Sequence, residues 1–542
     1  MKRRIVAMLL MLCTLAGLVL TGCGGGGGSS SGERVTLTIG VPQNANVTSY
    51  EDNDFTRYLE EAANVDLKFV FFPTNGDEYI RQLTLMAAAN ETMPDILWHF
   101  NNMNVVTRNE FGMSGYLMDL TDLIDKYAPD YKAAMARLNE HDRRRIENRA
   151  VAEDGCMYAM PEFFDMIVWD NLQSMLLINK DWLDTLGLEM PTTPDELYTV
   201  LKAFKEEDPN GNLIADEVPL FGRTNNLYSI TGWIINSFVY YNETYDYNVT
   251  DGKLWPAYTS DEYRQALIFL HKLCAEGLLS DMCFSAAQPE LKAMMTPASG
   301  TAQVGIFAGH PLTDADSNST ILEQYVPMAG LGDATGKGGY IVLNPKTLVF
   351  PLMITTDCQH PEAAMRFCNL FYRDETMTRQ RHGTRDVDWV EEPGLLPGGE
   401  EGYIKLVDSS AFFKGNHTWC ANGGGIGTPQ NYLATMDGSR RADQVIANMN
   451  KTVYEDILKD IVQPEERCED LVYTAAQYEE HRQYITPIRS YVLEQRNLFI
   501  LGTLDPNNDA QWDHYLKELD RLGLQADMEL MQGIYEANLL LD

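Results

Sequence analysis

Short apolar strands alternate with amphipathic helices near the N-terminus, and this order restricts the fold more than any other feature. Residues 35–41 alternate apolar and polar side chains as a half-buried strand does, and residues 65–72 and 94–98 form two further strand-like runs. Between these runs, residues 52–63 and 77–89 place apolar side chains at helical spacing. This β-α-β-α-β order predicts a doubly wound α/β sheet with right-handed crossovers.

Polar and aromatic side chains follow two of the predicted strands. Asn44 and Asn46 come after the first strand, and Trp98, His99 and Asn101 come after the third. In doubly wound sheets, ligands bind beyond the carboxyl ends of the strands. We therefore expect these side chains to line a ligand-binding edge.

Length and charge limit the organisation of the chain and its partners. A chain of 542 residues is too long for one hydrophobic core, so we expect at least two lobes. The formal net charge of -36 argues against nucleic acid, whose phosphates are bound by clustered Lys and Arg. The same charge disfavours a polyanionic ligand.

Residues 1–22 have the features of a bacterial export signal. A basic start precedes the apolar stretch over residues 5–20, which is short for a membrane span. The stretch ends in Leu-Thr-Gly-Cys at Cys23, which resembles the bacterial lipobox, whose cysteine is lipid-modified and becomes the first mature residue. Lipidation of Cys23, with residues 23–33 as a Gly/Ser tether, predicts anchoring at the extracellular face of the cytoplasmic membrane. An ordinary cleaved signal with a chance cysteine is the alternative.

The remaining cysteines show no paired C-x-x-C spacing, and their odd number prevents complete internal pairing. We expect most of them to be buried free thiols. They are Cys156, Cys274, Cys283, Cys358, Cys368, Cys420 and Cys468.

Helices are expected to dominate the rest of the chain. A capping box at Thr193 and Glu196, with Pro194 in the first turn, marks the clearest helix start. We predict helices over 117–127, 131–149, 193–207, 260–276, 285–295, 360–372, 489–499 and 509–541, strands over 174–179, 305–307 and 348–354, a Gly-rich loop or hinge over 330–340 and an irregular region over 415–429.

An acidic loop follows the capped helix. Side chains with oxygen atoms recur there at alternate positions, and an acidic pair closes the loop. Calcium prefers about six to eight oxygen ligands in a flexible arrangement. The sequence therefore predicts a structural calcium site, with a solvated turn without metal as the alternative. The predicted ligands are Asp208, Asn210, Asn212, Ile214 through its carbonyl, Asp216 and Glu217.

Several motifs occur in an order that is more specific than any one of them. Besides the lipobox and tether, they are Met93-Pro94-Asp95-Ile96, Asp154-Gly155, Tyr158-Ala159-Met160-Pro161, the block from Asn179 to Pro219, Glu276-Gly277-Leu278, Gly383, Val387-Asp388-Trp389, Gly502 to Trp512 and Leu522-Gly523-Leu524. Together they resemble the family 1 extracellular solute-binding lipoproteins of bacterial ABC transporters. The resemblance covers nearly all of the mature chain. It is strongest to the subgroup of alginate-oligosaccharide-binding proteins and Gram-positive lipoproteins.

The resemblance implies a type II periplasmic-binding-protein fold, with two doubly wound α/β lobes, a hinge and a helical C-terminal part. It implies a monomer without catalytic residues that captures a mono- or oligosaccharide between the lobes and delivers it to ABC transporter permease subunits. The implied lobes comprise residues 34–160 with 333–400, and residues 161–332 with 401–542.

The acidic loop also resembles the calcium site of the alginate-binding relatives. It lacks the final Glu of an EF-hand, since Pro219 stands at that position. It also carries Leu213 where the subgroup usually has Gly, and a left-handed leucine costs about 1–2 kcal/mol.

Sugar sites combine aromatic platforms with amide, carboxylate and guanidinium hydrogen-bond partners. Trp182 and Trp512 are assigned to packing, and each remaining tryptophan has core packing as its alternative role. The predicted ligand-binding residues are Asn44, Trp98, His99, Trp233, Trp255, Arg385, Trp389, Trp419 and Asn422, with Arg223 and Asp388 as further polar partners.

Two other functions remain open from the sequence. An extracellular carbohydrate-active enzyme would need two carboxylates about 5–10 Å apart across a cleft, for which Asp386 and Asp388 are the candidates. A surface sensor or adhesin could use the same fold. Ligand-induced closure without turnover, together with transporter membrane subunits encoded next to the gene, would distinguish the binding protein from both.

Overall fold

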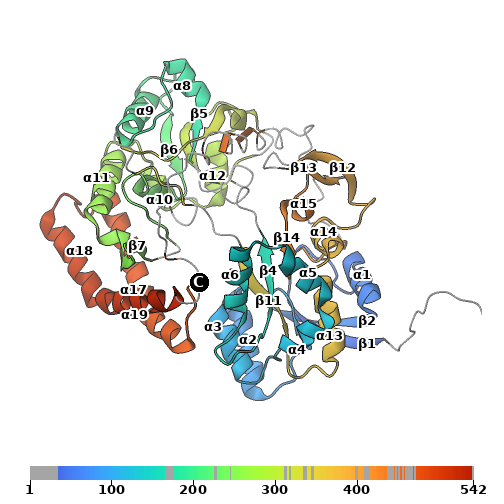
Figure 1. The fold of residues 1–542 in the computed structure, drawn as a ribbon. Coiled ribbons are helices and arrows are strands. Elements are labelled where there is room, and N and C mark those ends of the chain that lie inside the picture. Colours follow the sequence, from blue (N-terminus) through green and yellow to red (C-terminus); the bar gives the residue numbers. More distant parts are fainter. Residues whose placement is uncertain are drawn as a thin grey trace, which may run out of the picture. The chain divides into compact units, whose positions relative to one another are not determined.

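Six strands form the sheet that contains the N-terminal β-α-β-α-β unit (Figure 1). The spatial order is β14-β4-β11-β3-β1-β2. β2 and β3 run parallel to β1, whereas β11 runs antiparallel to β3 and β4. The strands predicted first are therefore confirmed. The six are β1 (Val35–Pro42), β2 (Val65–Phe72), β3 (Ile96–Leu97), β4 (Met160–Phe164), β11 (Thr347–Ile354) and β14 (Gly425–Gly427).

The computed structural model describes a large part of the chain, and all structural statements concern that part. The described residues are 34–164, 176–224, 229–243, 246–309, 314–316, 319–333, 338–342, 347–396, 401–407, 416–420, 423–435, 445, 448–449, 452–453, 457, 468 and 471–539. Cys23, the tether and Asn422 lie outside them.

Helices cover both faces of the six-stranded sheet. Ile96 and Leu97 are adjacent on β3 and enter two different hydrophobic clusters, because successive strand side chains point to opposite faces. α1 (Asp54–Ala63), α4 (Thr121–Tyr127), α5 (Pro129–Arg137) and α13 (Pro361–Leu370) share one cluster, and α2 (Gly76–Ala89) and α3 (Val105–Met113) contribute to the other.

The long helix predicted over 131–149 is wrong in one respect, because it is two helices. α5 ends at Arg137, and α6 (Glu140–Ala150) begins after Asn139, whose side chain accepts a hydrogen bond from the Asp142 backbone N–H. Asn is a strong N-cap residue, so the break has a local cause. The helix predicted from residue 117 begins only at Thr121.

A second sheet has four strands in the order β10-β5-β9-β6. β6 pairs in parallel with β9, and β5 runs antiparallel to β9 and β10. The strands are β5 (Leu176–Asn179), β6 (Val218–Gly222), β9 (Val304–Ala308) and β10 (Tyr325–Pro327).

One hydrophobic core joins this second sheet to most of the remaining helices. Figure 1 shows α17, α18 and α19 grouped beside α11. The predicted helix over 509–541 is divided at Gly523, whose φ of 99° ends one helix before the next begins. The helices are α8 (Lys180–Leu186), α9 (Pro194–Glu206), α10 (Ile230–Ile235), α11 (Asp261–Ala275), α12 (Gln288–Met295), α17 (Ala475–Ile500), α18 (Asp509–Arg521) and α19 (Leu524–Asn538).

Several short elements complete the fold. Two hairpins are formed by β7 (Asn248–Thr250) with β8 (Lys253–Trp255) and by β12 (Trp389–Leu395) with β13 (Glu401–Leu406). The other short elements are α14 (Asp374–His382), α15 (Pro429–Tyr432) and 3-10 turns over Ala257–Thr259, Asp281–Phe284 and Thr320–Gln324.

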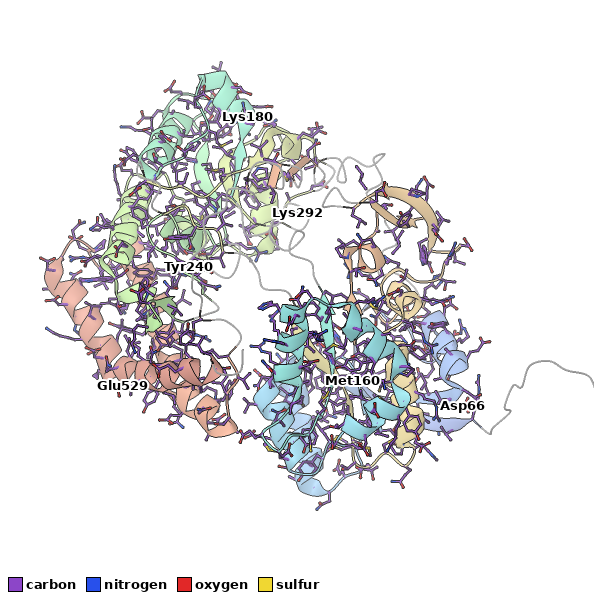
Figure 2. All side chains as sticks on the ribbon, in the orientation of Figure 1. Asp66, Met160, Lys180, Tyr240, Lys292 and Glu529 are labelled. Atoms are coloured by element: carbon purple, nitrogen blue, oxygen red, sulfur yellow. The ribbon has the colours of Figure 1, made fainter. Side chains whose placement is uncertain are left out.

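Two strands of the six-stranded sheet lie across or beyond the predicted lobe boundaries. Residues 401–542 were expected in the second lobe, yet β14 pairs with β4 in the six-stranded sheet. β4 itself begins at Met160, which is labelled in Figure 2, and it crosses the predicted boundary after that residue. Residues Val35–Asp542 form one compact unit, so two separate lobes stay a prediction.

Candidate functional site

Four predicted ligand-binding residues lie together where β1 and β3 end. Trp98 and His99 directly follow β3, and their ring centroids are 5.3 Å apart. Trp419 packs edge-to-face on Trp98, with centroids 4.9 Å apart. Asn44 follows β1, and its Nδ2 donates a hydrogen bond to the Cys420 carbonyl at 3.0 Å. The structure therefore brings these four residues together; the strand order predicted this edge for Asn44, Trp98 and His99, whereas Trp419 was predicted from its irregular loop.

Trp98 and Trp419 are core side chains in this structure. Their exposed fractions are 1% and 0%. Trp419 Nε1 donates a hydrogen bond to Thr56 Oγ1 at 2.8 Å, and a Cβ at Gly423 would lie 1.9 Å from Trp98 Nε1. Neither ring offers a free face, so contact of either one with a sugar stays a prediction that requires this edge to rearrange.

Arg385 and Trp389 belong to a loop that contacts the same region. The Arg385 guanidinium lies 5.7 Å from the Trp389 ring centroid and pairs with Glu391 at 2.6 Å. Asp388 accepts a hydrogen bond from the Thr384 backbone N–H at 2.6 Å. Asp388 Oδ1 also lies 2.6 Å from Nδ1 of His417, two residues before Trp419. The carboxylate of Asp388 thus orders the loop that carries Arg385 and Trp389.

Trp233 and Trp255 belong to the core of the four-stranded sheet. Trp233, on α10, is 7% exposed, and Trp255 is half-buried with its Nε1 bonded to Thr250 Oγ1 at 3.0 Å. Arg223 forms a salt bridge with the buried Asp314. Among the described residues, neither tryptophan ring contacts that of Trp98. Packing is also the role of Trp182 and Trp512, which are 2% and 4% exposed.

Two polar cavities, which the sequence did not predict, adjoin α17. We call the larger one the His481 cavity; its volume is about 350 Å³. The Tyr258 cavity has a volume of about 140 Å³. Asp246 and Arg489 line both cavities. The segment that contributes Asp246 begins near Tyr240, which is labelled in Figure 2.

The two residues that line both cavities, Asp246 and Arg489, form a bidentate ion pair. Arg489 Nε and Nη2 each donate to one carboxylate oxygen of Asp246 at 2.6 Å. His481 Nδ1 lies 2.8 Å from Asp527, and Tyr247 Oη donates to the same carboxylate at 2.6 Å. The buried carboxylate of Asp527 therefore holds one wall of the His481 cavity in place.

Aromatic and cationic side chains complete the His481 cavity. Tyr473 stacks on the His481 ring with an interplanar angle of 16°. Arg149, from α6, and Arg482 also line it. An aromatic wall with several hydrogen-bonding groups suits a hydroxyl-rich ligand.

Charge is balanced in the Tyr258 cavity. Glu243 and Asp246 line it together with Arg489 and Arg496. Arg496 is 2% exposed and pairs with Glu243 at 2.5 Å. Burial lowers the pKa of Arg496, but Glu243 and the nearby Tyr hydroxyls raise it by more, so the pKa lies above its ordinary value. The ion pair therefore persists in the buried wall.

Sequence reasoning missed these cavities because their walls come from distant segments. Asp246 and Arg489 are 243 residues apart. The predicted sugar contacts were instead mainly tryptophans and residues at strand ends. The tyrosines between residues 240 and 258 were the available local signal, since tyrosine combines a ring face with a polar tip.

Hydrogen bonds to Asp216 hold the acidic loop between α9 and β6. Asn210 and Asn212 both donate to Asp216 Oδ1, at 3.3 and 3.0 Å. The hydrogen bond from Asn212 contributes most to lowering the pKa of Asp216. Those from Gln303 and Asn210 act in the same direction. Leu213 has φ of 62°, so it takes the left-handed conformation expected at that position.

Two carboxylate oxygens in this loop fit a cation. Asp208 Oδ1 and Glu217 Oε1 are buried and have no hydrogen-bond partner among the described residues. Burial, and then the charges of Asp216 and Asp208, raise the pKa of Glu217. A cation would relieve this repulsion. In the described part of the chain no three His, Cys, Asp or Glu side chains converge as metal ligands, so Asn and backbone oxygens would have to take part.

Comparison with known proteins identifies the family. The family model of the bacterial extracellular solute-binding proteins matches residues 44–378.

The chain belongs to this family.

It is therefore a binding protein and not an enzyme, as the resemblance implied, and it has the predicted type II periplasmic-binding-protein fold. Within the described part of the chain, no helix has the length and apolar character needed to cross a bilayer.

Three curated relatives match parts of this solute-binding protein. The fructooligosaccharide ABC transporter substrate-binding protein FusA of Streptococcus pneumoniae is 32% identical over 199 residues, which is 35% of this chain and 36% of that protein. Lipoprotein LipO of Bacillus subtilis is 28% identical over 49% of each chain. The polygalacturonan/rhamnogalacturonan-binding protein YtcQ of Bacillus subtilis is 28% identical over 41% of this chain and 40% of its own. The matches thus span about half or less of each relative.

Solved structures share the fold over almost the whole solute-binding protein. A solute-binding protein of Bifidobacterium longum subsp. infantis has a TM-score of 0.75 at 22% identity, covering 93% of this chain and 98% of its own. FusA of S. pneumoniae with kestose has a TM-score of 0.72 at 20% identity, covering 94% and 100%. Alginate-binding protein AlgQ2 without calcium ion has a TM-score of 0.62 at 20% identity, covering 93% and 98%. A FusA EF-hand mutant has also been solved.

Proposed function

We propose that this solute-binding protein captures a carbohydrate, either a mono- or an oligosaccharide, and delivers it to the permease subunits of an ABC transporter. Two of the three curated relatives are named for carbohydrates, one for a fructooligosaccharide and the other for polygalacturonan and rhamnogalacturonan. The observation that carries the proposal is the pair of cavities at α17, where tyrosines accompany the Asp246–Arg489 ion pair. Such pairs offer a donor and an acceptor side by side, which matches neighbouring sugar hydroxyls.

The protein would act as a monomer anchored by a lipid on Cys23 at the extracellular face of the membrane. The lipobox-like end of the signal supports this. Mass spectrometry of the protein purified from bacterial membranes tests it. A diacylglyceryl group on an N-terminal Cys23 is expected, and an unmodified soluble protein cut elsewhere would contradict it.

The two sheets would form the cores of two lobes that close on the sugar. β4 and β14 then belong with the first lobe, because both pair in the six-stranded sheet. The edge that carries Asn44, Trp98, His99 and Trp419 would face the solute from that lobe, with Arg385 and Trp389 on the adjoining loop.

Calcium would bind the loop over Asp208 to Glu217 and stabilise it. The two unpartnered carboxylate oxygens and the left-handed Leu213 support the assignment. Asp208, Asn210, Asn212, Asp216, Glu217 and the Ile214 carbonyl would hold the ion. The site would tie the end of α9 to β6, with a structural role only.

A thermal-shift screen of the mature protein tests the proposed function. The screen uses mono- and oligosaccharides, with peptides as the control class. At least one sugar is expected to raise the melting temperature, because a ligand that binds the native state alone stabilises it. A response to peptides and to no sugar would contradict the proposal.

A further inference from the structure

We propose that the Tyr258 cavity is the subsite for one uncharged sugar ring, so that the solute is a neutral carbohydrate and not a sugar acid. The inference rests on the proposed carbohydrate-binding function and deepens it. The cavity lies between the 241–258 segment and α17, and its lining residues come only from these two segments.

Two polar groups in the cavity wall lack a partner within the described part of the chain. They are Tyr258 Oη and Arg496 Nε. Tyr258 is 5% exposed and Arg496 is 2% exposed, and both side chains line the cavity. A buried polar group without a hydrogen bond costs about 1–3 kcal/mol, which makes two of them in one cavity wall an unusual arrangement. A ring with several hydroxyl groups would supply the missing partners.

The carboxylates in the same wall can accept hydrogen bonds from such a ring. Each ionised carboxylate has about four lone-pair sites. Asp246 uses some of its sites for Arg489, and Glu243 uses one for Arg496 Nη1. A sugar hydroxyl can accept from Arg496 Nε and donate to Glu243 or Asp246 at the same time. Burial, and then the Asp246 and Asp527 charges, raise the pKa of Tyr258, so its hydroxyl remains a donor.

Charge balance in the cavity excludes an acidic ring. Both arginines that line it, Arg489 and Arg496, are paired with a carboxylate that also lines it. A uronate would add a third carboxylate to a wall whose cations are already matched. Burying an uncompensated charge is far more costly than burying a hydrogen-bonded hydroxyl.

The test compares two tyrosine variants that lose only a hydroxyl. Tyr258→Phe removes the hydroxyl that lines the cavity. Tyr263→Phe is the matched control, since Tyr263 is 1% exposed, its hydroxyl also lacks a described partner, and it lines neither cavity. Affinities are measured by titration calorimetry with kestose, maltotriose, cellotriose, xylotriose, mannotriose and trigalacturonate.

Wild type is expected to bind at least one neutral trisaccharide more tightly than trigalacturonate. Tyr258→Phe is expected to weaken the neutral ligand about 3- to 10-fold, the effect of one net hydrogen bond, and to leave the ligand-free melting temperature unchanged or higher. Tyr263→Phe is expected to leave the affinity unchanged.

Three results would overturn the subsite. Equal affinity of wild type and Tyr258→Phe for a bound neutral sugar would refute it while leaving the carbohydrate function intact. Tightest binding of trigalacturonate would refute the uncharged class. Failure of wild type to bind any sugar, in this set or in the thermal-shift screen, would contradict the subsite together with the function on which it rests.

Discussion

Leu213 holds a backbone conformation that leucine avoids. Its φ is 62° and its side chain is 90% exposed, so no packing compensates for the strain. Its backbone N–H donates to Asp208 Oδ2 at 3.1 Å, which keeps the residue in the turn that the loop needs. This prediction came from the resemblance to the calcium-site subgroup, which usually has Gly at this position. By contrast, the packing of Trp98 on Trp419 depends on folding of the whole sheet and had no local signal.

Leu213→Gly is expected to raise the free energy of unfolding by about 0.5–1 kcal/mol. Relief of about 1–2 kcal/mol of left-handed strain exceeds the greater freedom of glycine in the unfolded chain. Urea denaturation measures the difference. Leu213→Ala keeps a Cβ and serves as the control, so a Gly variant no more stable than the Ala variant would contradict the assignment.

At the scale of elements, local signals predicted well and long-range ones did not. The start of α9 was predicted from a capping box, and Thr193 and Glu196 form both of its hydrogen bonds. The break at Asn139 was missed because residues 131–149 were interpreted as one helix, although residues 139–145 contain no apolar side chain. The pairing of β14 with β4 joins residues such as Gly425 and Glu162, and no local pattern encodes such a distant pairing.

Thr193→Ala is expected to lower the free energy of unfolding by about 1 kcal/mol, since it removes the N-cap of α9. Chemical denaturation checks the value. The control is Thr199→Ala in the same helix, where Thr199 is exposed and alanine has the higher helix propensity. Equal losses in both variants would mean that the cap contributes nothing specific.

Glu162→Gln is expected to change the pH dependence of stability. Burial raises the pKa of Glu162 to about 7, only partly opposed by the hydrogen bond from the Gly424 N–H. The native state then holds a proton that the unfolded state releases near its ordinary pKa of 4.5. Wild-type stability relative to the variant should therefore fall as pH rises from about 4.5 to 7 and remain constant above that.

Between pH 4.5 and pH 8, the free energy of unfolding of wild type should fall by roughly 2–3 kcal/mol relative to that of Glu162→Gln. Denaturation at several pH values measures it. Glu401→Gln, on the exposed β13, is the control. A constant difference between wild type and Glu162→Gln across this range would show that the carboxylate is already ionised at low pH.

Glu217→Gln is expected to have opposite effects with and without calcium. In chelator the variant should be more stable than wild type, because a partly buried carboxylate beside those of Asp216 and Asp208 is removed. In calcium it should be less stable, because an ion at about 100 times its dissociation constant adds about 2.7 kcal/mol to wild type. Melting temperatures in both conditions test this. The same order of stability in both would argue against a bound ion.

At the scale of the whole molecule, the fold and family were predictable and the binding cavities were not. Strand order, the lipobox-like Cys23 and the order of motifs led to the family from the sequence alone. The cavities form where α17 packs against a distant segment of the chain. Asp246 and Arg489, which line both cavities, are 243 residues apart in the sequence. Such a surface exists only after tertiary packing, so the tryptophans and strand ends in the sequence did not indicate it.

Carbohydrate capture without turnover is the central claim, and titration calorimetry with recovery of the ligand tests it most directly. The mature wild-type protein is titrated with the best sugar from the thermal-shift screen, and the recovered sugar is analysed by chromatography. One saturable site per chain and an unchanged sugar are predicted. Absence of saturable heat with every sugar, or recovery of a cleaved sugar, would contradict the account.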